Sequence, residues 1–165
     1  MGEMKKIGFD FENVGGLCEI YAVPKGCFRK VGHDWAKGTR TAYLRNREQI
    51  IAIPMWADDT FQFVENKDES DGGTYYDVLI SGIIPKQEAT NEHLVEELER
   101  SEWVVLSRDN NGIIRLSGSD EVPLRFNSQK DTGVAFASRN GIGFTFTGKQ
   151  PVGSIIVDAA RLSEV

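Results

Sequence analysis

The segment VVLSRDNNGIIRLSG, which spans Val104 to Gly118, contains two apolar, largely β-branched runs on either side of a polar sequence. Such runs favour β-strands, and Asn111-Gly112 is a strong hairpin signal because both residues tolerate a positive φ. Asp109 and Asn110 can hydrogen-bond to nearby backbone groups and steady a turn. We therefore predict that Asn111 and Gly112 form a two-residue hairpin turn.

The same polar sequence raises the question of a calcium-binding loop. A calcium loop needs acidic residues at alternating positions, closed by a later Glu. No acidic residue lies between Asp109 and Asp120. The calcium pattern therefore fails, and we expect the segment only to reverse the chain.

Patterns typical of strands recur along most of the chain. Alternation of apolar and polar residues, or enrichment in β-branched and aromatic residues, marks each of them, and turn residues separate them. Two polar stretches, 32–40 and 66–73, are predicted to be loops. The predicted strands cover residues 17–24, 41–44, 49–56, 60–66, 74–85, 103–109, 112–118, 132–137, 141–148 and 153–160. In the first of them, Leu17 and Val23 are expected on one face, and Ile20 and Ala22 on the other.

One segment, residues 91–102, has the pattern of an α-helix. Thr90 is a suitable N-cap, and Leu94, Val95 and Leu98 form a narrow apolar stripe. A helix of about three turns is not stable alone, so it must pack on the sheet. The fold class predicted is mostly β: a β-sandwich or barrel of about nine strands with one flanking α-helix.

Length and composition indicate one ordinary domain. The chain has 165 residues and a net charge of −6, with 40 % hydrophobic residues. The acidic balance argues against a grip on nucleic-acid phosphates. No apolar run is long enough for a membrane span, and no signal peptide is recognised, so we expect synthesis in the cytoplasm. Residues 1–14 are interpreted as an N-terminal arm and residues 15–165 as a single β-rich domain.

No catalytic, cofactor or metal site is expected. The sequence GFTFTGKQ (143–150) matches a phosphate-binding loop except that Gln150 stands where Ser or Thr is required, and its alternating Phe and Thr predict a strand. His33 and His93 are the only histidines, so a three-histidine metal site is excluded. His33-Asp34 has no marked nucleophile beside it. We therefore predict that the protein is not an enzyme.

The order of these parts resembles the tail-tube class of structural proteins in phages and prophages. The resemblance covers roughly Gly16 to Val157 and is carried by the sequences DNNG (109–112), RLSG (115–118), PLRF (123–126) and GIGFTFTG (141–148). It implies a β-sandwich subunit that forms homo-oligomeric, hexameric rings with other tail proteins as partners, and DNA only as cargo in the lumen. It also implies a cytoplasmic protein before assembly and a virion component afterwards. The polar stretch 66–73 is short for a stacking hairpin, which leaves a neck or minor tail protein open.

The N-terminal arm is the predicted assembly element. Ile7, Phe9 and Phe11 stand at alternate positions, as an added strand requires in order to bury one face against a neighbour's sheet. Gly15-Gly16 follows as a natural hinge. We expect the arm to become ordered only against another copy.

A second hypothesis is a small β-barrel module that binds a small hydrophobic ligand. The aromatic residues Tyr75, Tyr76, Phe144 and Phe146 favour it, since ligand cavities are lined mainly by apolar and aromatic side chains. Alternating aromatic residues are, however, more often part of a core.

Calcium, zinc, magnesium and ATP are each expected to leave the melting temperature unchanged. A ligand that binds only the native state must stabilise it, so a thermal melt with each added in turn tests the absence of a site. A rise of several degrees with any of the four would show that a real site was dismissed.

Overall fold

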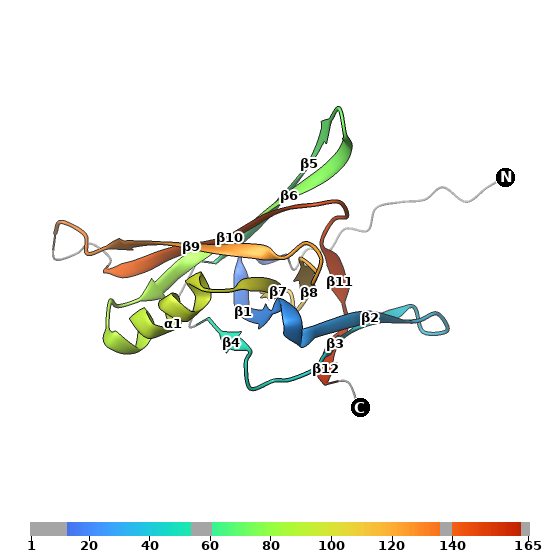
Figure 1. Ribbon diagram of the computed structural model, residues 1–165, viewed down its shortest axis with the longest axis horizontal. Helices are drawn as coiled ribbons and strands as arrows, with labels where there is room; N and C mark the ends of the chain where they lie inside the picture. Colours follow the sequence, from blue (N-terminus) through green and yellow to red (C-terminus); the bar gives the residue numbers. More distant parts are fainter. Residues whose placement is uncertain (1–12, 54–60, 136–139, 163–165) are drawn as a thin grey trace.

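The computed structural model describes residues 13–53, 61–135 and 140–162. Within these ranges the protein is mostly β, with strands in two sheets and a single α-helix (Figure 1). Neither sheet closes into a barrel in the described part of the chain. The prediction of a mostly β, sandwich-like fold with one helix is therefore confirmed.

The strands divide unequally between the two sheets. The smaller sheet has the order β12-β3-β2, and the larger has the path β11-β8-β7-β9-β10-β6-β5, with β1 paired to β7 and β4 paired to β1. The elements are β1 (Leu17–Pro24), the 3-10 turn η1 (Lys25–Cys27), β2 (Phe28–Asp34), β3 (Thr39–Leu44), β4 (Ile51–Ala52), β5 (Gln62–Ser70), β6 (Gly73–Pro85), α1 (Ala89–Glu99), β7 (Glu102–Asp109), β8 (Ile114–Ser117), β9 (Leu124–Asp131), β10 (Gly141–Gln150), β11 (Ile155–Val157) and β12 (Ala159–Leu162).

Strand β7 lies between two hydrophobic cores. It pairs with β1 along one edge, and with β8 and the start of β9 along the other. Trp103 and Val105 point into the first core, whereas Val104 and Leu106 point into the second. Because both faces are covered, the four residues from Trp103 to Leu106 are all apolar instead of alternating with polar ones. The apolar run of β7 therefore lies in the middle of the molecule, between the two cores.

The first core lies between β1 and β7 on one side and β6, β9 and β10 on the other. Its centre is aromatic: the Phe126 and Phe144 rings stack at 5.9 Å, and the Phe61 ring meets Phe144 edge-on at 5.6 Å. Phe61 also covers Gly82, where a Cβ atom would lie 2.2 Å from its ring. The Leu17 N–H donates to the Phe61 carbonyl at 3.1 Å, which ties the two ends of the curled sheet around this core.

The second core lies between the other face of β1, β7, β8 and β11 and the three-stranded sheet. Val23, Phe28, Leu44, Leu116 and Val157 are buried there. Strands β11 and β12 are separated by Asp158, whose backbone N–H donates to the Arg40 carbonyl at 2.8 Å. The segment 153–160, predicted as one strand, therefore joins the two sheets.

The predicted faces of β1 are wrong at Leu17. The pairing of β1 with β7 shifts register between Leu17 and Glu19. This bulge adds a residue, so Leu17 joins Ile20 and Ala22 in the first core, while Val23 lies in the second. An alternation count cannot anticipate such an insertion.

Helix α1 covers one end of the first core, and its predicted start is wrong. The N-cap is Glu88, which makes no side-chain cap hydrogen bond, and Thr90 lies inside the first turn. The Asn91 side chain instead ties this end to the Lys86 carbonyl at 3.2 Å. Val95 and Leu98 are buried as predicted, with Leu94 packed beside them.

Further predictions of strands and loops differ from the structure. Residues 132–135 are not in a strand, and 136–137 lie outside the described residues. Strand β9 was missed because only Leu124 and Phe126 are buried along it. The predicted loops 32–40 and 66–73 are the ends of hairpins β2–β3 and β5–β6, whose outer residues are polar because both faces are exposed. Strand β4 is only two residues long, and 54–60 lies outside the described residues.

The turn after β7 contains three residues, one more than predicted. The Gly112 N–H donates to the Asp109 carbonyl at 2.9 Å, and the Asp109 N–H donates to the Ile113 carbonyl at 3.0 Å. Asn110 and Asn111 therefore occupy the centre of the turn, and Gly112 follows with φ +83°. A tight turn closed by a left-handed glycine is the common form of a three-residue hairpin loop.

Gly112→Val is expected to lower the free energy of unfolding by about 1–2 kcal/mol, because a β-branched residue resists the left-handed conformation. Gly26→Val is the matched control, since the added side chain meets nothing within 4 Å and the φ is ordinary. Equal denaturation midpoints for the two variants would contradict the assigned turn.

Candidate functional site

The turn after β7 binds the segment that precedes β1. The Asn111 side chain accepts from the Val14 N–H at 2.9 Å and donates to the Val14 carbonyl at 3.0 Å. Asn110 donates from its side chain to the Gly15 carbonyl and from its backbone to the Gly16 carbonyl at 3.2 Å. The turn therefore holds a piece of its own chain, in addition to reversing it.

Asp109 fixes the shape of this turn. One carboxylate oxygen accepts from the Asn111 and Ile113 N–H groups at 2.9 Å each, and the other accepts from Arg115 at 3.0 Å. Burial acts to raise the pKa of Asp109, but the hydrogen bonds from Ile113, Arg115 and Asn111 outweigh it and the pKa is lowered. The carboxylate is thus charged, and it keeps both asparagines oriented towards the N-terminal segment.

The predicted arm, residues 1–14, ends at this anchor. Ile7, Phe9 and Phe11 lie outside the described residues, so the structure does not test their role. The hydrogen bonds to Val14, Gly15 and Gly16 hold the predicted hinge against the turn.

Several strand edges have no partner strand in the described part of the chain. Strand β5 pairs only with β6, β12 only with β3, and β2 only with β3. An open edge presents backbone N–H and C=O groups that another chain can complete. These edges are therefore available for pairing with another strand.

Two hairpins project from the cores and carry opposite charge. The β5–β6 hairpin extends beyond the rest of its sheet (Figure 1) and holds Asp68, Glu69 and Asp71 around its tip. The Tyr75 hydroxyl donates a hydrogen bond to the Asp68 carboxylate at 3.0 Å and orients it. The pKa of Asp68 is lowered, mainly by the hydrogen bond from the Glu69 N–H and then by the one from Tyr75. The acidic stretch is thus part of an ordered hairpin.

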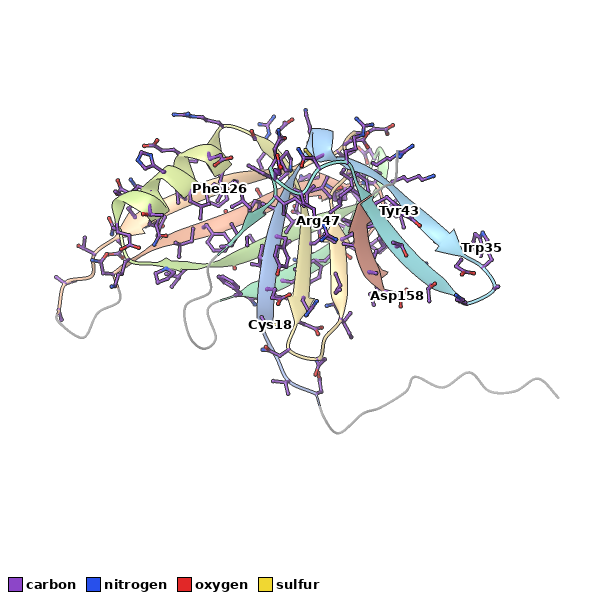
Figure 2. All side chains as sticks on the ribbon, turned by 90° about the horizontal axis from the view of Figure 1, so that it is seen from below. Cys18, Trp35, Tyr43, Arg47, Phe126 and Asp158 are labelled. Atoms are coloured by element: carbon purple, nitrogen blue, oxygen red, sulfur yellow. The ribbon has the colours of Figure 1, made fainter. Side chains whose placement is uncertain are left out.

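The second hairpin, β2–β3, diverges from β1 and ends at Trp35 (Figure 2). The Trp35 side chain is 86 % exposed and stacks on His33 with 5.0 Å between ring centroids. Its strands and turn carry the basic residues Arg29, Lys30, Lys37 and Arg40, against one acidic residue, Asp34. An exposed Trp with basic neighbours is a typical anchor at protein interfaces.

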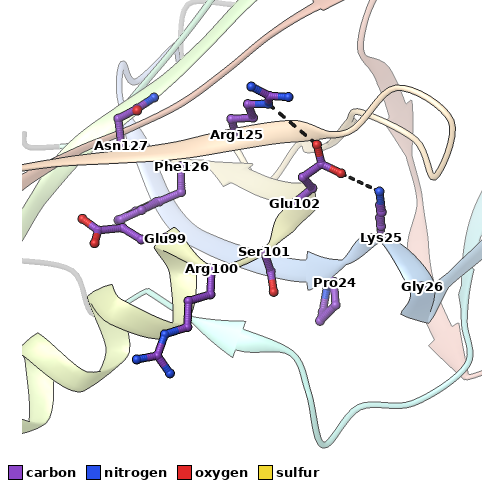
Figure 3. Close-up of a pocket in the computed structure, with 10 residues that line it drawn as sticks. All are labelled: Pro24, Lys25, Gly26, Glu99, Arg100, Ser101, Glu102, Arg125, Phe126 and Asn127. Carbon is purple, nitrogen blue, oxygen red and sulfur yellow. Dashed lines mark hydrogen bonds and ion pairs between the residues drawn. The ribbon is translucent and has the colours of Figure 1, made fainter.

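A hollow of about 640 Å³ lies between the end of α1, η1 and β9 (Figure 3). Glu102 stands at one wall and pairs with Lys25 and, at 3.7 Å, with Arg125. The hydrogen bond from Lys25 is the main reason that the pKa of Glu102 is lowered. These three charges therefore satisfy one another at the wall of the hollow.

A groove of about 550 Å³ lies where the two sheets meet, and Ala160 of β12 is among its lining residues. Its floor is apolar, with Tyr21 and Leu106 from the larger sheet and Leu44 and Ala160 from the smaller one. Arg47 and Arg108 stand beside this floor. The groove was not predicted from the sequence, because it depends on how the two sheets meet.

The residues considered for chemistry do not form a site. Among the described residues no group of three His, Cys, Asp or Glu side chains is placed to hold a metal ion. The sequence GFTFTGKQ lies in strand β10, and His93 lies on α1 with Glu96 at 3.8 Å. The described helix is too short and polar to span a membrane.

No protein-family model matches the chain, and neither the curated proteins nor the solved structures contain a match to it.

Asp109→Asn is expected to lower the free energy of unfolding near neutral pH by about 1–2 kcal/mol, because charge-assisted hydrogen bonds are lost. The lowered pKa means that this contribution is complete above the ordinary value of 3.8 and disappears as the pH falls through the lowered one. The difference between the two proteins, measured by urea unfolding at a series of pH values, should thus shrink below pH 4. A difference that is constant from pH 7 to pH 3 would contradict the role of the charge.

Proposed function

We propose that the protein is a structural subunit that assembles with copies of itself into a closed ring, as a component of a phage or prophage tail tube or neck. The observation that carries the proposal is that the segment Val14 to Gly16, at the end of the predicted arm, is anchored to a domain with open strand edges. The proposal gives the protein no catalytic role, cofactor or metal. Its partners are further copies and neighbouring tail proteins.

The open edges support assembly by strand pairing. A protein that remains single protects such edges with short strands, charged side chains, prolines or a covering loop. Here β5 is nine residues long and pairs with β6 alone among the described residues, and its first three residues, Gln62 to Val64, carry no charge. An edge of this length can accept a strand from a neighbour, and repetition of one contact by rotation closes a ring.

The two projecting hairpins support a head-to-tail arrangement. The acidic tip of β5–β6 and the basic β2–β3 hairpin lie on different parts of the molecule (Figure 1). Opposite charges on separate surfaces favour contact between unlike surfaces of two copies and disfavour contact between like ones. The projecting β5–β6 hairpin, which is longer than the polar stretch 66–73, also supports a role in stacking.

The aromatic residues that favoured a ligand-binding barrel have other positions. Phe144 and Phe146 are buried and pack against Phe126 in the first core. Tyr75 donates a hydrogen bond to Asp68 in the outer part of the β5–β6 hairpin, and Tyr76 follows it on β6. These side chains fill the core or lie on a hairpin, so the observations favour assembly over ligand binding.

Deletion of residues 1–12 is expected to abolish ring or polymer formation and to leave the melting temperature nearly unchanged. The deletion ends before Asn13, so the contacts of Val14, Gly15 and Gly16 with the turn remain. Light scattering after size exclusion at rising concentration, with electron microscopy, measures the assembly.

Deletion of residues 1–6 is the matched control, because it retains Ile7, Phe9 and Phe11 and should assemble. A full-length protein that stays monomeric at every concentration, with a 1–12 deletion that unfolds the domain, would overturn the proposal.

A further inference from the structure

The groove along β12 has the features of a site for an added strand. Strand β12 pairs in parallel with β3, and Ala160 is opposite Ala42. Within the described residues nothing pairs with the other edge of β12. Ala160 of this strand also lines the groove, and Tyr21 in the apolar floor is 37 % exposed. A strand placed here gains backbone hydrogen bonds on one side and an apolar surface on one face.

The charges around the groove restrict what can bind. The guanidinium of Arg108 pairs with Glu19 at 3.4 Å, whereas no acidic side chain of the described residues pairs with Arg47. The groove also continues past Arg108 as a smaller hollow of about 150 Å³ that reaches Glu19 and Ile114. The site therefore suits an extended segment with apolar residues on one face and acidic residues on the other.

The N-terminal sequence IGFDFE (7–12) has this alternation. In an extended conformation Ile7, Phe9 and Phe11 share one face, and Asp10 and Glu12 share the other. The apolar face matches the floor, and Asp10 and Glu12 have the charge opposite to that of Arg47, which lines the groove without an acidic partner among the described residues. We propose that residues 7–12 of a second copy add to the open edge of β12 and fill this groove.

The anchor argues that the strand comes from another copy. The Asn110 and Asn111 contacts fix Val14 at the turn end of β7, beyond Arg108. The groove runs from Arg108 back towards Leu106 and Ala52. To fill its own groove the chain would have to reverse immediately before Val14, whereas an arm that continues outward reaches a neighbour. This assignment rests on the proposed self-assembly and names the two surfaces that meet.

Photo-crosslinking in the full-length protein tests the contact directly. Phe9 is replaced by p-benzoylphenylalanine, and copies grown with ¹⁴N and ¹⁵N are mixed before illumination. We expect mixed-isotope crosslinks between position 9 and peptides that contain Tyr21, Ala52 or Ala160. Crosslinks within a single copy, or to another surface of an assembled ring, would overturn this assignment and leave the proposed function standing.

Charge reversal tests the polar face of the same contact. Arg47→Glu should weaken assembly by about fivefold or more, since an exposed ion pair of up to about 1 kcal/mol is replaced by repulsion. Adding Asp10→Lys and Glu12→Lys should restore most of the loss. Lys86→Glu makes the same charge change at an exposed position away from the groove and should have no effect.

The outcomes of the two experiments separate the two proposals. Rings that form normally with Arg47→Glu contradict the groove assignment alone. A loss of assembly with Arg47→Glu that Asp10→Lys and Glu12→Lys do not restore contradicts it as well. A protein that is monomeric in every variant and at every concentration contradicts the self-assembly on which the assignment depends.

Discussion

Burial of both faces of β7 is the constraint on which the rest of the structure depends. Five consecutive side chains, Trp103 to Ser107, are buried, and the apolar ones alternate between the two cores. A strand in this position must be covered from both sides, so the larger sheet curls over one face and the three-stranded sheet covers the other. The Trp103 ring N–H donates to the Leu98 carbonyl at 2.8 Å, which also fixes the end of α1. The helix, both sheets and both cores therefore meet at one strand.

The same strand anchors the segment that precedes β1. At its end the Asp109 carboxylate shapes the turn, and the turn asparagines hold Val14, Gly15 and Gly16. A segment held at a fixed point lowers the entropy that is lost when the chain before it binds another copy, as we propose. The core and the proposed assembly element are in this sense linked through one strand.

Much of the fold was predictable, because the residue pattern within each of several segments indicates its secondary structure. The buried run of β7, the long strand β6, the alternation in β10 and the stripe of α1 were all recognised from the sequence. Strand β9 and the outer parts of the two hairpins were not, because their polar residues are paired by backbone hydrogen bonds that need no apolar pattern. The bulge in β1 and the groove beside β12 depend on tertiary arrangement and leave no local signal. The role of the turn was half predicted: Asn111-Gly112 indicated a reversal, but the bond of Asn111 to Val14 joins residues 97 positions apart.

Native-state hydrogen exchange of the β7 amides tests the central role of this strand most directly. The account predicts that the amides of Val104, Val105 and Leu106 exchange only by global unfolding. Buried amides on either side, such as Ala42 in the smaller sheet and Phe146 in the larger one, should then show the same free energy and the same dependence on denaturant. The contradictory result is a smaller sheet whose buried amides exchange through a separate, lower-energy opening while β7 and β10 stay protected. That result would mean that the two cores are independent and that β7 does not unite them.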